Sequence, residues 1–129
     1  MNWREPARLA GFALAAGVVY EILLGYRPDY PGHFLAGFGA TAVLLAIARR
    51  VPDPNGWRDV LVLVTAVAVG VLCEFTVFHV VITDPVDITN QSLGAALAAA
   101  CVTGRPTSDY ALVAVGFPAL VAGFFFVYA

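Results

Sequence analysis

Five apolar stretches separated by short polar turns make up most of this sequence. A helix needs roughly 20 apolar residues to cross about 30 Å of hydrocarbon, and four of the stretches meet or approach this length. The sequence is 60% hydrophobic and 12% charged, whereas soluble domains have about 25% charged residues. We therefore predict a single all-α domain, residues 1–129, that crosses a cell membrane several times. The five predicted spans are Leu9–Tyr26, His33–Ala48, Val60–Ile82, Asp87–Thr103 and Tyr110–Tyr128.

The fourth stretch, Asp87–Thr103, is short and begins with polar residues. It is either a fifth span or a tilted or re-entrant helix that the other helices shelter from lipid. If it stays at the interface, both chain ends lie on the same side of the membrane. A signal peptide is the alternative for the first stretch, although Glu21 near its end argues against a cleaved leader.

The arginines are divided unevenly between the two ends of the predicted spans. If all five stretches cross, one side receives six arginines and the other receives only Arg27. Cytoplasmic loops have an excess of Lys and Arg, so we predict the N-terminus in the cytoplasm and the C-terminus outside. No basic run indicates nucleic-acid binding. The six arginines are Arg4, Arg8, Arg49, Arg50, Arg58 and Arg105.

Polar residues gather in the outward halves of these spans. An ionisable group near the centre of a span costs about 2.5 to 3.5 kcal/mol on insertion scales, so such groups usually face a protein interior or a wet cavity. Glu74 follows fourteen uncharged residues, which places it roughly 22 Å along a helix from Asp59. Glu74 is therefore a candidate for a functional site, and the alternative is a protonated carboxyl that only bonds the neighbouring backbone. For Glu21, the alternative to a functional role is extension of the side chain to the membrane interface.

Two helical faces place further polar residues at the same level. His33, Gly37 and Thr41 form one stripe, in which the small residues allow another helix to approach the imidazole. At the start of the fourth stretch, Asp84 and Pro85 are typical of a helix N-terminus. Asp87, Asn90, Gln91 and Gly94 then share one face. We predict one outward-facing polar pocket made of Glu21, His33, Glu74, Asp87, Asn90 and Gln91.

The middle half of the chain resembles the VanZ-like group of small membrane proteins. The resemblance rests on His33-Phe34, on the lone Glu74, and on the run Asp87-Ile88-Thr89-Asn90-Gln91-Ser92-Leu93-Gly94-Ala95. In that group a His-Phe pair, a membrane glutamate and an Asp-x-x-x-Asn-x-x-Gly type stretch occur in this order. Here the Asp-to-Asn spacing is three, and the group's usual lysine before the histidine and glutamine after the glutamate are absent. The resemblance implies a link to low-level glycopeptide resistance.

Three functions are consistent with these residues. The leading hypothesis is a VanZ-like protein that binds or acts on a lipid or envelope headgroup, with His33 as proton carrier or metal ligand and Glu74 or Asp87 orienting it. The second is a haem-binding electron-transfer subunit that uses His33 and His79 as axial ligands. The third is a small structural subunit of a homo-oligomer or larger membrane complex, because the stretch Tyr110–Tyr128 is wholly apolar after its first residue. The sequence identifies no cofactor, and it does not show whether the protein is an enzyme.

Overall fold

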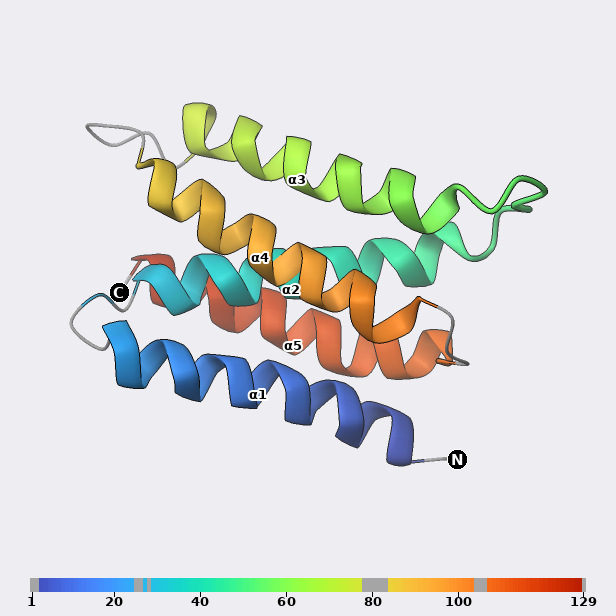
Figure 1. Ribbon diagram of the computed structural model, residues 1–129, viewed down its shortest axis with the longest axis horizontal. Helices are drawn as coiled ribbons and strands as arrows, with labels where there is room; N and C mark the ends of the chain where they lie inside the picture. The colour runs from blue at the N-terminus through green and yellow to red at the C-terminus, as the bar shows by residue number, and fades with distance from the viewer. Residues whose placement is uncertain (1–2, 25–26, 28, 78–83, 104–106, 129) are drawn as a thin grey trace.

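The structure is a computed structural model that describes residues 3–24, 27, 29–77, 84–103 and 107–128, and these residues form five α-helices (Figure 1). The prediction of an all-α chain is confirmed. Four of the helices, α1, α2, α3 and α5, are long and apolar enough to cross a membrane. The helices are α1 (Arg4–Leu24), α2 (Asp29–Ala48), α3 (Arg58–Thr76), α4 (Pro85–Val102) and α5 (Asp109–Tyr128).

Successive helices run in opposite directions, so the first and last helices place the two chain ends at opposite ends of the bundle (Figure 1). The remaining helix, α4, has 18 residues and is not among the four helices that are long and apolar enough to cross a membrane. It packs against α2 and α3, along much of their length. These neighbours provide the shelter that its polar first turns need.

The central helix is α2, which packs against every other helix of the bundle. Its contact with α4 is close because both helices have glycines there. A Cβ atom on Gly37 would overlap the carbonyl oxygen of Gln91, and one on Gly94 would overlap the carbonyl oxygen of Phe34. The prediction that small residues below His33 admit a neighbouring helix is therefore confirmed, and that neighbour is α4.

The contact between α2 and α5 is built in the same way. A Cβ atom on Gly39 would overlap backbone atoms of Gly116 and Leu120, and one on Gly123 would overlap the backbone of Ala36. The last helix also continues through Pro118 without ending. It is therefore a structural partner of α2 along one face, whereas Phe125 on its other side is 70% exposed.

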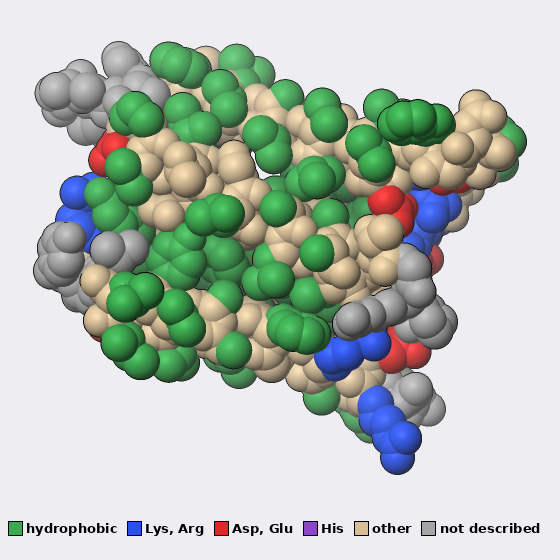
Figure 2. Space-filling model, in the orientation of Figure 1, with side chains coloured by type: hydrophobic (Ala, Val, Ile, Leu, Met, Phe, Trp, Pro, Cys, Tyr) green, Lys and Arg blue, Asp and Glu red, His purple; other side chains and the backbone are tan. Residues whose placement is uncertain are grey.

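Large apolar side chains cover the outside of the bundle. Ile22 on α1 and Phe125 on α5 are 76% and 70% exposed. On the face of the bundle drawn in Figure 2, hydrophobic side chains cover much of the surface and charged groups gather at the two ends. An apolar surface of this extent is unfavourable in water. It is the surface expected where lipid chains take the place of water.

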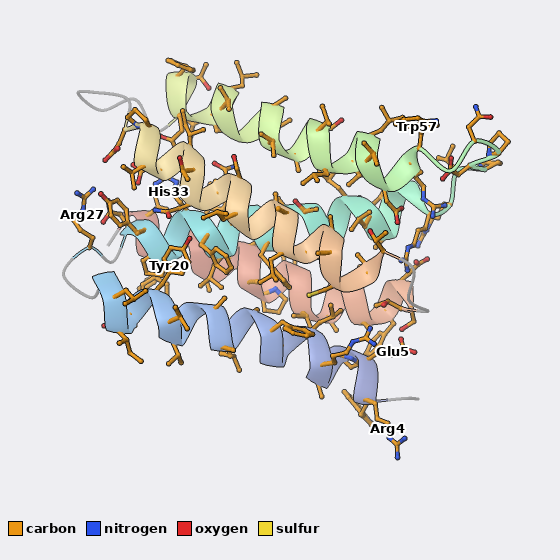
Figure 3. All side chains as sticks on the ribbon, viewed as in Figure 1. Arg4, Glu5, Tyr20, Arg27, His33 and Trp57 are labelled. Atoms are coloured by element: carbon orange, nitrogen blue, oxygen red, sulfur yellow. The ribbon has the colours of Figure 1, made fainter. Side chains whose placement is uncertain are left out.

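The two ends of the bundle differ in charge. At one end, which we call the arginine end, α1 and α3 begin and α2 finishes, with Arg4, Glu5 and Trp57 labelled there in Figure 3. The opposite end contains His33 and Arg27, and we call it the histidine end. Arg105, predicted at the arginine end, lies outside the described residues.

At the arginine end the contacts join segments that are far apart in the chain. Arg8 Nη2 donates to Thr107 Oγ1 at 3.1 Å, and the Ser108 N–H donates to Glu5 Oε2 at 2.8 Å. Arg49 Nη1 donates to the Thr107 carbonyl oxygen. These bonds hold the start of α1 and the finish of α2 against the segment that leads into α5.

Candidate functional site

Three helices bring His33, Glu74 and Asp87 together at the histidine end. His33 lies about one turn into α2, and Glu74 lies in the last turn of α3. The start of α4 is fixed by Asp84, whose Oδ1 accepts a hydrogen bond from the Val86 N–H at 2.8 Å, and by proline at its first position. This start places Asp87 in the first turn of α4, beside His33.

The imidazole of His33 lies between the two carboxyl groups. Its Nδ1 is 3.1 Å from Glu74 Oε1, and its Nε2 is 3.6 Å from Asp87 Oδ2. The side chains of His33 and Glu74 are each 4% exposed, and that of Asp87 is 13% exposed. We call these three residues the triad. The ring of His33 thus lies between the two carboxyls, with one ring nitrogen near each of them.

The contacts within the triad are close but leave polar atoms unused. Although Glu74 Oε1 is near the ring, it does not form an aligned hydrogen bond, and Oε1, Asp87 Oδ1 and Asn90 Nδ2 have no hydrogen-bond partner among the described residues. A buried polar atom without a partner costs about 1 to 3 kcal/mol. Such atoms are uncommon in folded proteins and often occur where function needs them.

A second charged group lies near the triad at the same end of the bundle. Arg27 Nη2 is 2.7 Å from Asp29 Oδ2 and 3.5 Å from Asp84 Oδ2, and its guanidinium carbon lies 4.2 Å from the centre of the Tyr30 ring. Hydrogen bonding to Asp29 raises the pKa of Arg27 above its ordinary value. The arginine therefore stays charged and holds the start of α2 to the start of α4.

The predicted site residues are not all brought together. His33, Glu74 and Asp87 meet as predicted, and Asn90 is buried on α4. The side-chain amide of Gln91 lies against α3, because a Cβ atom on Gly70 would overlap it. The sequence-based grouping thus places three ionisable groups correctly, with Asn90 on the same helix as Asp87.

Glu21 does not belong to this site, and its inclusion in the pocket was wrong. It is exposed near the end of α1 and lines a cavity with Gly17, Pro31 and Leu35 instead. On α2, Pro31 and Leu35 are each two positions from His33, so they point to the opposite side of that helix. The body of α2 separates Glu21 from the triad.

Arg27 and Asp29 are neighbours of the site that the predicted pocket does not include. In the sequence, Arg27 stands out only as the exception to the arginine distribution. The signal that was available is the close spacing of two opposite charges, Arg27 and Asp29, ahead of His33. That pair predicts a fixed turn before α2, although its contact with Asp84 depends on the tertiary structure.

Two of the predicted chemistries can be compared with this geometry. Among the described residues, no three His, Cys, Asp or Glu side chains form a group that could hold a metal ion. Both ring nitrogens of His33 lie within 3.6 Å of a carboxyl oxygen, whereas an axial haem ligand needs one nitrogen directed at the iron. His79, the second predicted haem ligand, lies outside the described residues.

The chain matches no family model, and neither a curated protein nor a solved structure is significantly similar to it. The geometry of the triad is therefore the basis for assigning a function.

Proposed function

We propose that this protein is a multi-pass cell-membrane protein of the VanZ-like kind, in which the triad binds the polar headgroup of a lipid or envelope molecule and exchanges a proton with it. The observation that supports this most is the position of the His33 ring between Glu74 and Asp87. Histidine exchanges protons near neutral pH more readily than any other side chain. Two flanking carboxyls orient the ring and can accept or return its proton.

The unpartnered atoms give the proposed site its capacity to bind. Asp87 Oδ1 is a free hydrogen-bond acceptor among the described residues, and Asn90 Nδ2 is a free donor. A headgroup that has both hydroxyl or amine donors and an acceptor oxygen would satisfy these atoms. A buried site built to hydrogen-bond such groups discriminates strongly against molecules that lack them.

The direction from which a ligand arrives follows from the charge distribution. We propose that the arginine end faces the cytoplasm, in accordance with the excess of Arg in cytoplasmic loops, and that the histidine end faces outward. A reporter that is active only after export, fused after Ala129, should then be active. Reporter activity confined to a cytoplasmic sensor would contradict an outward-facing site.

Glu74→Gln tests the role of the triad, and Glu21→Gln is its matched control. Both variants replace a carboxyl by an amide of the same shape, but only Glu74 contacts His33. In a glycopeptide-susceptible host, the wild-type protein should allow growth at a higher glycopeptide concentration. The Glu74→Gln protein should be present at wild-type levels and lose this protection, whereas Glu21→Gln should keep it.

Two outcomes would contradict the proposal. If the wild-type protein gives no protection, the VanZ-like assignment fails. If Glu74→Gln is folded and protects as well as the wild type, the carboxyl is a structural group, and the protein is better described as a structural subunit. Folding is checked in both variants by the thermal unfolding of purified protein in detergent.

A further inference from the structure

A long apolar groove lies between α1 and α5, closed on one side by α2. It consists of two adjoining cavities of about 420 Å³ and 200 Å³, both lined by Leu35 and Phe126. The smaller cavity lies toward the histidine end, where Glu21 lines it. We call the two cavities together the α1/α5 groove.

The wall of the groove on α1 consists of Leu14 and a row of small residues that ends at a carboxylate. Ala10, Ala13, Gly17 and Glu21 line it at spacings of three or four residues, so they share one face of the helix. From Ala10 to Glu21 the helix rises roughly 16 Å. One leaflet of hydrocarbon is about 15 Å thick, which is half of the 30 Å core. The groove therefore has the length of one lipid chain.

The groove is separate from the triad. Its residues on α2, Pro31 and Leu35, lie on the other side of that helix from His33, which contacts α3 and α4. An occupant of the groove would not touch the triad. The inference below does not depend on the proposed function, and either can fail without the other.

We propose that the α1/α5 groove holds one acyl chain of a phospholipid whose amine-bearing headgroup lies beside Glu21. The groove lies between two helices that are both apolar enough to cross a membrane, so hydrocarbon is the medium around it. Ala119 and Pro118 on α5 form the facing wall, with only small or ring side chains at these positions. A straight hydrocarbon chain is the shape that suits such a space.

The carboxylate determines the headgroup. Glu21 is the single ionisable residue among those that line the two cavities, within the described part of the chain. A carboxylate there favours a cation and repels a second anion. An ammonium group of phosphatidylethanolamine satisfies both its charge and its hydrogen-bonding capacity, whereas the quaternary ammonium of phosphatidylcholine has no N–H to donate.

A pair of glycines provides a sharp test of the chain position. Gly17 lines the groove and Gly11 does not, although a Cβ atom at either position would meet no other atom within 4 Å. A side chain can therefore begin at either site without a clash at its Cβ atom, and leucine favours a helix more than glycine does. The leucine side chain of the Gly17→Leu variant should fill the groove. That of the Gly11→Leu variant should lie on another side of α1.

The experiment measures lipid that stays bound to the purified protein. Wild-type, Gly17→Leu, Gly11→Leu and Glu21→Gln proteins are reconstituted in nanodiscs of equal parts palmitoyl-oleoyl phosphatidylethanolamine and phosphatidylcholine, then released and weighed by native mass spectrometry. The wild type and Gly11→Leu should retain one phosphatidylethanolamine. Gly17→Leu should lose most of this adduct, and Glu21→Gln should retain both lipids equally.

Three results would overturn the proposal. A Gly17→Leu protein that keeps the adduct at the wild-type level would show that the chain binds elsewhere. A Glu21→Gln protein that still prefers phosphatidylethanolamine would remove the headgroup assignment. A wild-type protein that is released as a lipid-free dimer, and that becomes monomeric on Gly17→Leu substitution, would show that a second copy of the chain fills the groove.

Discussion

The two ends of the bundle use polar side chains in opposite ways. At the arginine end, Glu5 and Arg8 bond the segment around Thr107, and these contacts join chain segments near the surface. At the histidine end, His33 and Glu74 are each 4% exposed and contact one another inside the bundle. Contacts of the first kind hold helix ends together. Contacts of the second kind require ionisable groups to lose their hydration, which is unfavourable. Such groups are retained where their chemistry is needed for function.

This difference predicts unequal effects of substitution. The largest should come from His33→Leu, which leaves Glu74 and Asp87 buried side by side without the imidazole between them. Removing one partner of a buried ionic group typically costs about 3 to 5 kcal/mol. Thermal unfolding in detergent should show a large decrease in melting temperature. An unchanged melting temperature would mean that the triad is open to water.

The close approach of α2 and α4 should show the next largest effect. Gly37→Ala places a methyl group against the backbone of Gln91, and overpacking of this kind costs about 1 to 3 kcal/mol. It should also move Asp87 away from His33. Gly11→Ala, where a Cβ meets open space, is the control and should lose no stability. Equal melting temperatures for the two variants would contradict the tight helix contact.

A smaller effect is expected at Asn90, whose Nδ2 is buried without a partner among the described residues. Asn90→Leu removes a donor that the fold does not use, so its free energy of unfolding should stay within about 1 kcal/mol of the wild type or increase. The glycopeptide protection expected of the wild type should nevertheless be lost. Loss of stability would show that the amide supports the fold and not a ligand.

The smallest effect is expected at the arginine end. Glu5→Gln keeps an oxygen that can accept the hydrogen bond from the Ser108 N–H, and exposed charged contacts contribute little to stability. Its melting temperature should equal that of the wild type within error. A decrease as large as that of His33→Leu would remove the distinction between the two ends.

Much of this arrangement could be predicted because it depends on local periodicity. Asn90 and Gly94, which the spacing places on one face of the fourth stretch, are both buried in α4. The cap formed by Asp84 and Pro85 is present where the sequence places it. The order and approximate bounds of the apolar stretches also correspond to the helices, although α2 begins at Asp29, four residues before the prediction.

The predictions that were wrong or incomplete concern Glu21 and Arg27, and both depend on how the helices are rotated against each other. Pro6, Leu9 and Ala13 are the buried residues of α1, and Glu21 lies roughly 80° around the helix from Ala13. The sequence of α1 is apolar on all sides, so it gives no signal for which side faces α2. The level of Glu21 along the bundle was predictable, whereas the side of α1 on which it lies was not. The contact of Arg27 with Asp84 is equally a matter of tertiary structure.

The central claim is that His33 and Glu74 form one coupled unit that excludes Glu21. A double-mutant cycle measures this directly through the unfolding free energies of His33→Ala, Glu74→Gln and their combination. A second cycle uses His33→Ala, Glu21→Gln and their combination. We expect a coupling energy of about 0.5 to 3 kcal/mol between His33 and Glu74, as for residues in contact. Between His33 and Glu21 it should stay within about 0.5 kcal/mol of zero. Equal coupling in the two cycles, or none between His33 and Glu74, would contradict the account.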